Sequence, residues 1–327
     1  MTRTRPTLPL AAALLLAGAF AITAHAQTAA PAASAPQAEA GDPPGSGPFP
    51  ALKEETASLP DHVVYRPARL DSVKPRQLGL YVFGNGACSD DGAMVRLHLL
   101  EIASHGYVAV ALGRIHSGPG ATAPAQPTAP RQVDAQGRPI FTSLPTSYTG
   151  MLAAIDWAAA QNADPKSPYF GKFDERAVAV SGYSCGGIQA LRVAGDPRVR
   201  TVVVMNSGIF RPGTGFNIAE MDVPKSHLDQ LHTPTLYILG GTGDIAYENG
   251  MDDFARINHV PVAMANLLGA GHGGTYWEPN GGKAATAVVA WLDWQLRGDR
   301  QAARAFVGPQ CGLCTDPAWE LRKKKID

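Results

Sequence analysis

The chain has 327 residues, of which 45% are hydrophobic and 17% are charged. Its 28 Lys and Arg residues equal its 28 Asp and Glu residues, so no excess of charge suggests a nucleic acid or another polyelectrolyte as a partner. Once the N-terminal segments are set aside, the remaining length suits one large α/β domain with its own core.

Residues 1–26 have the parts of a secretory signal peptide. Arg3 and Arg5 form a basic start, residues 8–22 are apolar, and Ala24-His25-Ala26 matches a cleavage site of small residues. The apolar run is short for a transmembrane span, which leaves an uncleaved anchor as the less favoured alternative. We therefore expect a periplasmic or secreted protein with no membrane attachment after cleavage.

Residues 27–49 are mostly Ala, Pro, Gly and Ser, a composition that predicts a disordered linker. The folded domain is expected over residues 50–327, and it includes a C-terminal tail with a Cys-x-x-Cys motif. The basic run Lys323–Lys325 near the end of this tail predicts a solvated segment.

Strand and helix patterns alternate along the domain. We predict strands at 78–83, 107–112, 177–180, 199–205, 235–239 and 260–268, and helices at 92–104, 147–160, 185–194, 246–257 and 284–296. A Pro/Gly-rich loop at 113–142 and an irregular segment at 206–232 interrupt the order. This alternation predicts a mostly parallel sheet with helices on both faces, so the turns that follow the strands should meet at one edge.

The segment Gly182-Tyr183-Ser184-Cys185-Gly186 lies between a predicted strand and a predicted helix. Gly-x-Ser-x-Gly in this setting is typical of a nucleophile elbow, in which a sharp turn presents the serine hydroxyl at the top of the sheet. The motif alone is weak evidence for a catalytic serine because glycine is abundant in this chain. The neighbouring turns must therefore provide a base and an acid that could activate Ser184.

Two later turns carry a carboxylate and a histidine. Asp244 follows the strand at 235–239, and His272 lies in a glycine-rich turn after the strand at 260–268. A histidine can take the serine proton, and a carboxylate can orient the imidazole, so we predict a Ser184–His272–Asp244 catalytic triad. The alternatives are His116 for the base and, for the acid, one of three aspartates: Asp222, Asp252 and Asp253.

Four cysteines in a secreted chain allow three pairings. Cys311 and Cys314 are near enough in sequence to close a local loop, which leaves Cys88 to pair with Cys185. A buried free thiol at Cys185 is the alternative. No pattern of metal ligands accompanies these cysteines, so we expect no metal site.

These turns, together with Gly84-Asn85-Gly86-Ala87 after the first strand, resemble the secreted α/β-hydrolases of the dienelactone-hydrolase-like and polyester-hydrolase-like group over about residues 75–297. Dienelactone hydrolases carry a cysteine where this chain has Ser184. Polyester hydrolases usually have Trp or His before the serine and Met after it, where this chain has Tyr183 and Cys185.

The resemblance implies the α/β-hydrolase fold and an oxyanion hole at the elbow. Its donors would be the backbone N–H of Cys185 and that of Ala87, with Gly86 as the alternative to Ala87. A disulfide between Cys88 and Cys185 would then join the two halves of the hole. Four aromatic residues near the same sheet edge are expected to form the substrate pocket: Tyr183, Phe210, Tyr276 and Trp277.

The sequence thus predicts a monomeric serine esterase that cleaves small or polymeric carboxylic esters through an acyl-enzyme at Ser184. This mechanism needs no cofactor and no metal. Two alternatives are a serine peptidase on the same fold and a hydrolase-like binding protein without catalytic activity.

Overall fold

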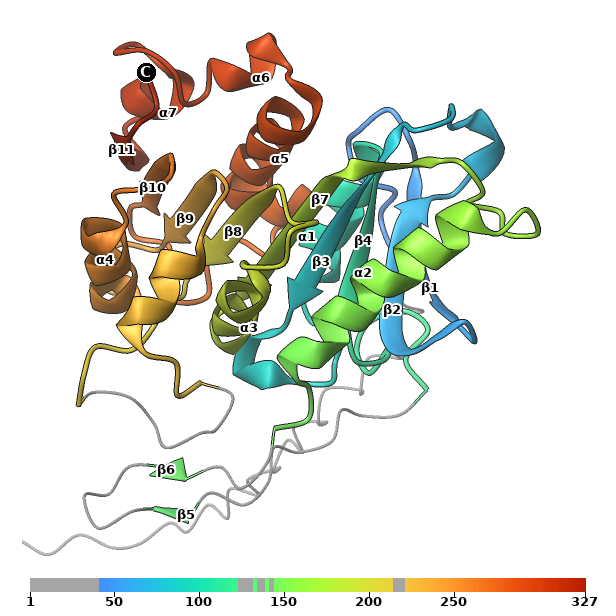
Figure 1. The fold of residues 1–327 in the computed structure, drawn as a ribbon, viewed down its shortest axis with the longest axis horizontal. Coiled ribbons are helices and arrows are strands. Elements are labelled where there is room, and N and C mark those ends of the chain that lie inside the picture. Colours follow the sequence, from blue (N-terminus) through green and yellow to red (C-terminus); the bar gives the residue numbers. More distant parts are fainter. Residues whose placement is uncertain (1–40, 123–131, 134–138, 141–143, 214–220) are drawn as a thin grey trace, which may run out of the picture. The chain divides into compact units, whose positions relative to one another are not determined.

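The computed structural model describes residues 41–122, 132–133, 139–140, 144–213 and 221–327. The predicted signal peptide and residues 27–40 of the predicted linker lie outside these described residues. Between Glu39 and Asp327 the described chain forms one compact α/β unit (Figure 1).

Its centre is a nine-stranded sheet with the strand order β1-β2-β4-β3-β7-β8-β9-β10-β11. The six inner strands from β4 to β10 run parallel, and within this sheet antiparallel pairing occurs at β1–β2, β2–β4 and β10–β11. The strands are β1 (Ala51–Thr56), β2 (Leu59–Pro67), β3 (Leu78–Gly84), β4 (Tyr107–Leu112), β7 (Phe173–Tyr183), β8 (Thr201–Met205), β9 (Thr235–Leu239), β10 (Val262–Leu267) and β11 (Trp319–Lys324). The prediction of an α/β fold with a mostly parallel sheet is confirmed.

Helices cover both faces of the sheet (Figure 1). The helices α2 (Tyr148–Ala163), α3 (Cys185–Val193) and α4 (Tyr247–Arg256) pack on one face, and α1 (Arg96–Ser104) and α5 (Gly282–Arg297) on the other. The pleat divides the side chains of each strand between two cores. On β7, for example, Val178 and Val180 join the α2–α3 side, whereas Ala179 joins the α1–α5 side.

The sheet is wider than the sequence predicted. Strands β1, β2 and β11 were missed, and the predicted loop at 113–142 contains a small antiparallel pair, β5 (Gln132–Val133) and β6 (Pro139–Ile140). The prediction of a solvated Lys323–Lys325 tail is wrong, because Lys323 and Lys324 belong to β11. The ammonium of Lys324 donates to three carbonyls at the end of α4, those of Phe254, Ala255 and Ile257.

The described end of the predicted linker is packed on the domain. The amide and hydroxyl of Ser46 donate to the Glu101 carboxylate, and the Phe49 N–H donates to the Ser104 carbonyl at 2.9 Å. The Asp42 carboxylate pairs with Lys53 and, at 3.0 Å, with Arg96. The linker boundary predicted at residue 49 is therefore too late, and the ordered domain begins by residue 42.

The parallel register brings the turns after β3, β7, β8, β9 and β10 to one edge of the sheet, since strands that run the same way end on the same side. Gly84 at the end of β3 even lies opposite Gly182 of β7. None of the helices in the described part of the chain has the length and apolarity that a membrane crossing requires.

The Asp42 contacts lead to a first prediction. The Lys53 side chain is only 4% exposed, so Asp42→Ala leaves a nearly buried ammonium without its carboxylate. We expect the free energy of unfolding to fall by about 3 kcal/mol in urea denaturation. Asp71→Ala, which breaks an exposed pair with Arg69, is the matched control and should leave the midpoint unchanged. An unchanged midpoint for Asp42→Ala would show that the contacts of Asp42 do not contribute to stability.

Candidate active site

Ser184 lies at the sharp turn between β7 and α3, with φ 54° and ψ −118°. This strained conformation depends on glycine at both flanking positions of the motif. A Cβ on Gly182 would lie 2.1 Å from the Gly186 carbonyl oxygen, and a Cβ on Gly186 would lie 1.9 Å from the Gly84 carbonyl oxygen. The elbow therefore packs backbone to backbone against the turn after β3.

His272 lies between Ser184 and Asp244. Its Nε2 is 2.9 Å from Ser184 Oγ, and its Nδ1 is 2.7 Å from Asp244 Oδ1. An ionised carboxylate can only accept, so Nδ1 carries the hydrogen and Nε2 of the neutral ring accepts from the serine hydroxyl. The arrangement can remove the serine proton and can stabilise the imidazolium that results.

Asp244 is ionised although it is buried. Burial raises the pKa of its carboxyl group, but the hydrogen bonds from His272, the Ala246 N–H, Asn206 and the Gly240 N–H outweigh burial and hold the pKa below its ordinary value. The folded-state pKa of Asp244 is lowered, so the ionised carboxylate stabilises the fold. This stabilisation is present above the unfolded-state pKa of the group and is lost as the pH falls through the folded-state pKa.

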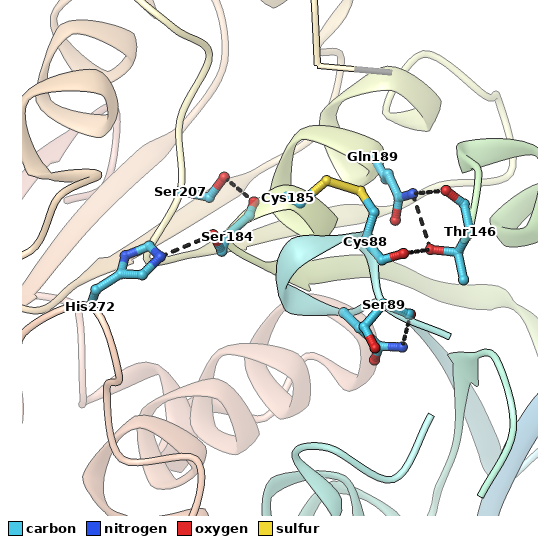
Figure 2. The surroundings of a disulfide bond; sticks show 9 residues. Cys88, Ser89, Thr146, Ser184, Cys185, Gln189, Ser207 and His272 are labelled. Carbon is cyan, nitrogen blue, oxygen red and sulfur yellow. Dashed lines mark hydrogen bonds between the residues drawn. A yellow bond between two sulfur atoms is a disulfide. The ribbon is translucent and has the colours of Figure 1, made fainter. Parts of the chain in front are cut away.

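The two disulfides join the predicted partners, Cys88 with Cys185 and Cys311 with Cys314. They are consistent with an oxidising, extracellular environment. The bond from Cys88 ties the turn after β3 to the first residue of α3, directly beside Ser184 (Figure 2). Sequence reasoning alone left open a free thiol at Cys185, and the structure excludes it.

The predicted oxyanion donors lie in the turn after β3 and at the start of α3. The N–H groups of Cys88 and Ser89 are used within the turn, where they donate to the carbonyls of Asn85 and Gly86. In the described part of the chain the Ala87 N–H has no acceptor, and the N–H of Cys185 opens helix α3, where a helix offers unpaired donors. The Cys185 N–H lies directly after Ser184, and the disulfide ties the turn that holds Ala87 to it; the role of these groups as oxyanion donors stays a prediction.

Neighbouring side chains hold this turn against the elbow. The amide and hydroxyl of Thr146 both donate to the Cys88 carbonyl, at 3.1 and 2.9 Å, and Gln189 of α3 donates to the Thr146 carbonyl at 3.0 Å. The Gly186 N–H donates to the Asn85 carbonyl at 3.0 Å. Figure 2 shows these contacts of Thr146 beside the disulfide. The separation of the two donor N–H groups is therefore set by covalent and hydrogen bonds together.

A cavity of about 290 Å³ opens beside Ser184 and His272. Of the four aromatic residues expected to form a pocket, Phe210 lines it. Residues that sequence reasoning missed also line it: Ile188, Asn206, Ser207, Gly208, Arg211, Met221, Ile245, Ala246, Glu248 and Asn249. Those at 206–221 were missed because this segment shows no periodic pattern, and those of α3 and α4 because a helical pattern does not tell which residues face a cavity. The lining combines apolar side chains, such as Ile188, Phe210 and Met221, with the charged Arg211 and Glu248.

The other three predicted pocket residues do not line this cavity. Tyr183 packs on the His272 ring with centroids 5.3 Å apart, and Tyr276 is fully buried behind Tyr183 at 4.8 Å. Trp277 is 49% exposed and lies edge-on to both tyrosines. The prediction for these residues is corrected accordingly: Tyr183 and Tyr276 support the histidine turn.

Two of the alternative acids and the alternative base are engaged elsewhere. Asp253 is buried with Lys225 and the Tyr237 hydroxyl, and Asp252 pairs with Lys225 and Arg256. Asp222 is exposed. His116 Nε2 lies 3.7 Å from the Asp90 carboxylate. Of the predicted site residues, the structure therefore brings Ser184, His272 and Asp244 together.

Comparisons with the models of known protein families and with curated proteins found no match for this chain. The assignment of a function therefore rests on the geometry of the site.

The close contact between the elbow and the turn after β3 can be tested by adding one methyl group at Gly186. Gly186→Ala forces the Gly84 carbonyl away and should lower the free energy of unfolding by about 2 kcal/mol, as overpacking does. Gly243→Ala is the matched control, because a Cβ there meets no atom within 4 Å. Thermal denaturation measures both, and equal melting temperatures would contradict the described packing.

Proposed function

We propose that this protein is a serine hydrolase with the α/β-hydrolase fold that cleaves carboxylic esters. One observation carries the proposal: Ser184 Oγ, His272 and the Asp244 carboxylate form a continuous hydrogen-bonded chain, and Ser184 and His272 line a cavity. The order serine, acid, histidine along the chain, with each residue after a strand, supports this fold among those that serine hydrolases use.

The reaction begins when Ser184 Oγ attacks the ester carbonyl carbon and its proton passes to His272 Nε2. Asp244, which stays ionised, stabilises the imidazolium. The oxyanion accepts hydrogen bonds from the N–H groups of Cys185 and Ala87. When the intermediate collapses, the C–O bond to the alcohol breaks and the alcohol takes the proton from His272.

Water then completes the cycle. It attacks the acyl-enzyme while His272 takes one of its protons, and a second oxyanion forms in the same hole. Collapse of this intermediate releases the carboxylic acid and returns the proton to Ser184 Oγ. Every proton is carried by His272, so the residues of this chain suffice for the whole reaction.

We place the protein with the secreted dienelactone-hydrolase-like and polyester-hydrolase-like enzymes, and we expect it in the periplasm or outside the cell. The cavity beside Ser184 is apolar where Ile188, Phe210 and Met221 lie, which favours an acyl or aryl group without charge near the scissile bond.

Ser184→Ala removes the nucleophile and should reduce the hydrolysis of 4-nitrophenyl acetate at least about 10⁴-fold while the fold is retained. A fluorophosphonate probe should label the native protein at Ser184 and leave the variant unlabelled, as peptide mass spectrometry would show. Full esterase activity in Ser184→Ala would refute the proposal. The absence of labelling and turnover in the native protein would favour the binding-protein alternative, and faster cleavage of a matched anilide would favour the peptidase.

The Cys88–Cys185 disulfide should support both stability and rate. It closes a loop with a sequence separation of 97, so its removal in Cys88→Ala/Cys185→Ala should cost about 4 kcal/mol of stability. In the folded variant, kcat should fall about 10-fold or more because the two oxyanion donors are no longer tied together.

The matched control is Cys311→Ala/Cys314→Ala, which opens a loop with a separation of 3 in the C-terminal segment. It should keep the native kcat. Equal kcat values for the two double variants, measured well below both melting temperatures, would mean that the Cys88–Cys185 bond has no part in catalysis.

A further inference from the structure

Asn206 is the first residue after β8 and contacts the turns that carry both partners of Ser184. It is 1% exposed and has φ 43°, a left-handed conformation that asparagine adopts more readily than most residues. Its Nδ2 donates to Asp244 Oδ2 at 2.7 Å and to the Gly271 carbonyl at 3.0 Å. One amide thus joins the acid turn to the residue directly before His272.

Tyr276 sets the orientation of that amide. The Tyr276 hydroxyl donates to Asn206 Oδ1, and the tyrosine is fully buried behind Tyr183. A phenol hydrogen directed at Oδ1 requires the amide to turn its Nδ2 hydrogens toward Asp244 and Gly271. Tyr276 also belongs to the segment that follows His272. Asn206 is therefore bonded to residues on both sides of His272, Gly271 before it and Tyr276 after it.

The carboxylate of Asp244 is consequently held at both oxygens. Oδ2 accepts from Asn206 and, at 3.1 Å, from the Gly240 N–H. Oδ1 accepts from the Ala246 N–H at 2.9 Å and from His272 Nδ1. Rotation of the carboxylate away from His272 would break bonds on both sides. The titratable groups that face Asp244 are His272, Tyr183 and Tyr276.

Ser207, the next residue, reaches the other side of the site. Its hydroxyl donates to the Ser184 carbonyl at 2.6 Å (Figure 2). The end of β8 therefore holds the acid through Asn206 and the elbow through Ser207, although neither residue touches the reacting atoms.

We propose that Asn206, oriented by Tyr276, is a positioning residue that keeps the Asp244 carboxylate aligned with His272 and thereby sets how well His272 activates Ser184. The inference rests on the proposed function. It adds two residues that the Gly-x-Ser-x-Gly motif and the Ser–His–Asp order do not include.

The test uses Tyr276→Phe and Asn206→Asp in the otherwise native chain. Activation of Ser184 is read from the rate of fluorophosphonate labelling, in which Ser184 Oγ displaces fluoride from phosphorus and His272 takes the proton. Turnover is read from kcat and KM for 4-nitrophenyl acetate. The labelling rate depends on the nucleophile and does not require the natural substrate to be known.

We expect Tyr276→Phe to lower kcat and the labelling rate by about 3- to 10-fold, with KM unchanged, since a loosened carboxylate affects the reaction and leaves the cavity intact. Tyr107→Phe is the matched control. This fully buried tyrosine donates to Asp293 at 2.8 Å and lies at the opposite end of the strands, so both rates should stay native.

Asn206→Asp replaces the donor with an acceptor of the same shape and places a second carboxylate beside Asp244. We expect kcat to fall by about 100-fold. The two carboxylates would be buried within hydrogen-bond distance of each other, so they would share one proton, and Asp244 would no longer be held as a fixed acceptor for His272. The loss should fall on kcat and on the labelling rate while KM stays native, a split that a general loss of structure would not produce.

Native kcat and labelling rate in both variants would overturn the proposal, and so would a rise in KM alone. If Asn206→Asp fails to fold, the kcat and the labelling rate of Tyr276→Phe decide whether the positioning role holds. Ser184→Ala is measured alongside: if it abolishes both signals while the two variants behave as native, only the positioning role fails. If Ser184→Ala retains hydrolysis, the proposed function itself is refuted.

Discussion

The close packing of the elbow on the turn after β3 is the constraint on which the site depends. Ser184 has a backbone conformation that costs on the order of 1–3 kcal/mol and persists only where its surroundings enforce it. The surroundings do so from three sides. The Ser184 N–H donates to the Met205 carbonyl, Ser207 holds the Ser184 carbonyl, and the Gly186 N–H donates to the Asn85 carbonyl. The Cys88–Cys185 bond adds a covalent link to the same contact.

The second requirement is that the buried Asp244 carboxylate stays ionised. Asp244 is 3% exposed, and a carboxylate removed from water to this extent is stable only with several donors. These donors come from different strand-end turns: the amides of Gly240 and Ala246 lie beside Asp244 itself, Asn206 follows β8, and His272 follows β10. The parallel sheet makes this convergence possible because it ends all of these strands on one side.

The inner strands could be predicted from the sequence because strands buried on both faces appear as short apolar runs between turn residues. The outer strands could not, since β1 and β11 carry exposed charged side chains, such as Glu55 and Arg322, and resemble loops. Likewise, the composition of residues 41–49 predicted a linker, whereas Gly47 lets the backbone approach Ser104 so closely that the segment packs on α1.

Local patterns in the sequence determined the α/β class, the Gly-x-Ser-x-Gly turn and the three residues most suited to activate one another. The residues around them depended on tertiary structure. Asn206 reaches Asp244 across 38 positions of sequence, and Tyr276 reaches Asn206 across 70. The cavity wall likewise combines α3, the segment after β8 and the start of α4. Such contacts follow from strand order and register, because these decide which turns become neighbours, and no local periodicity encodes that order.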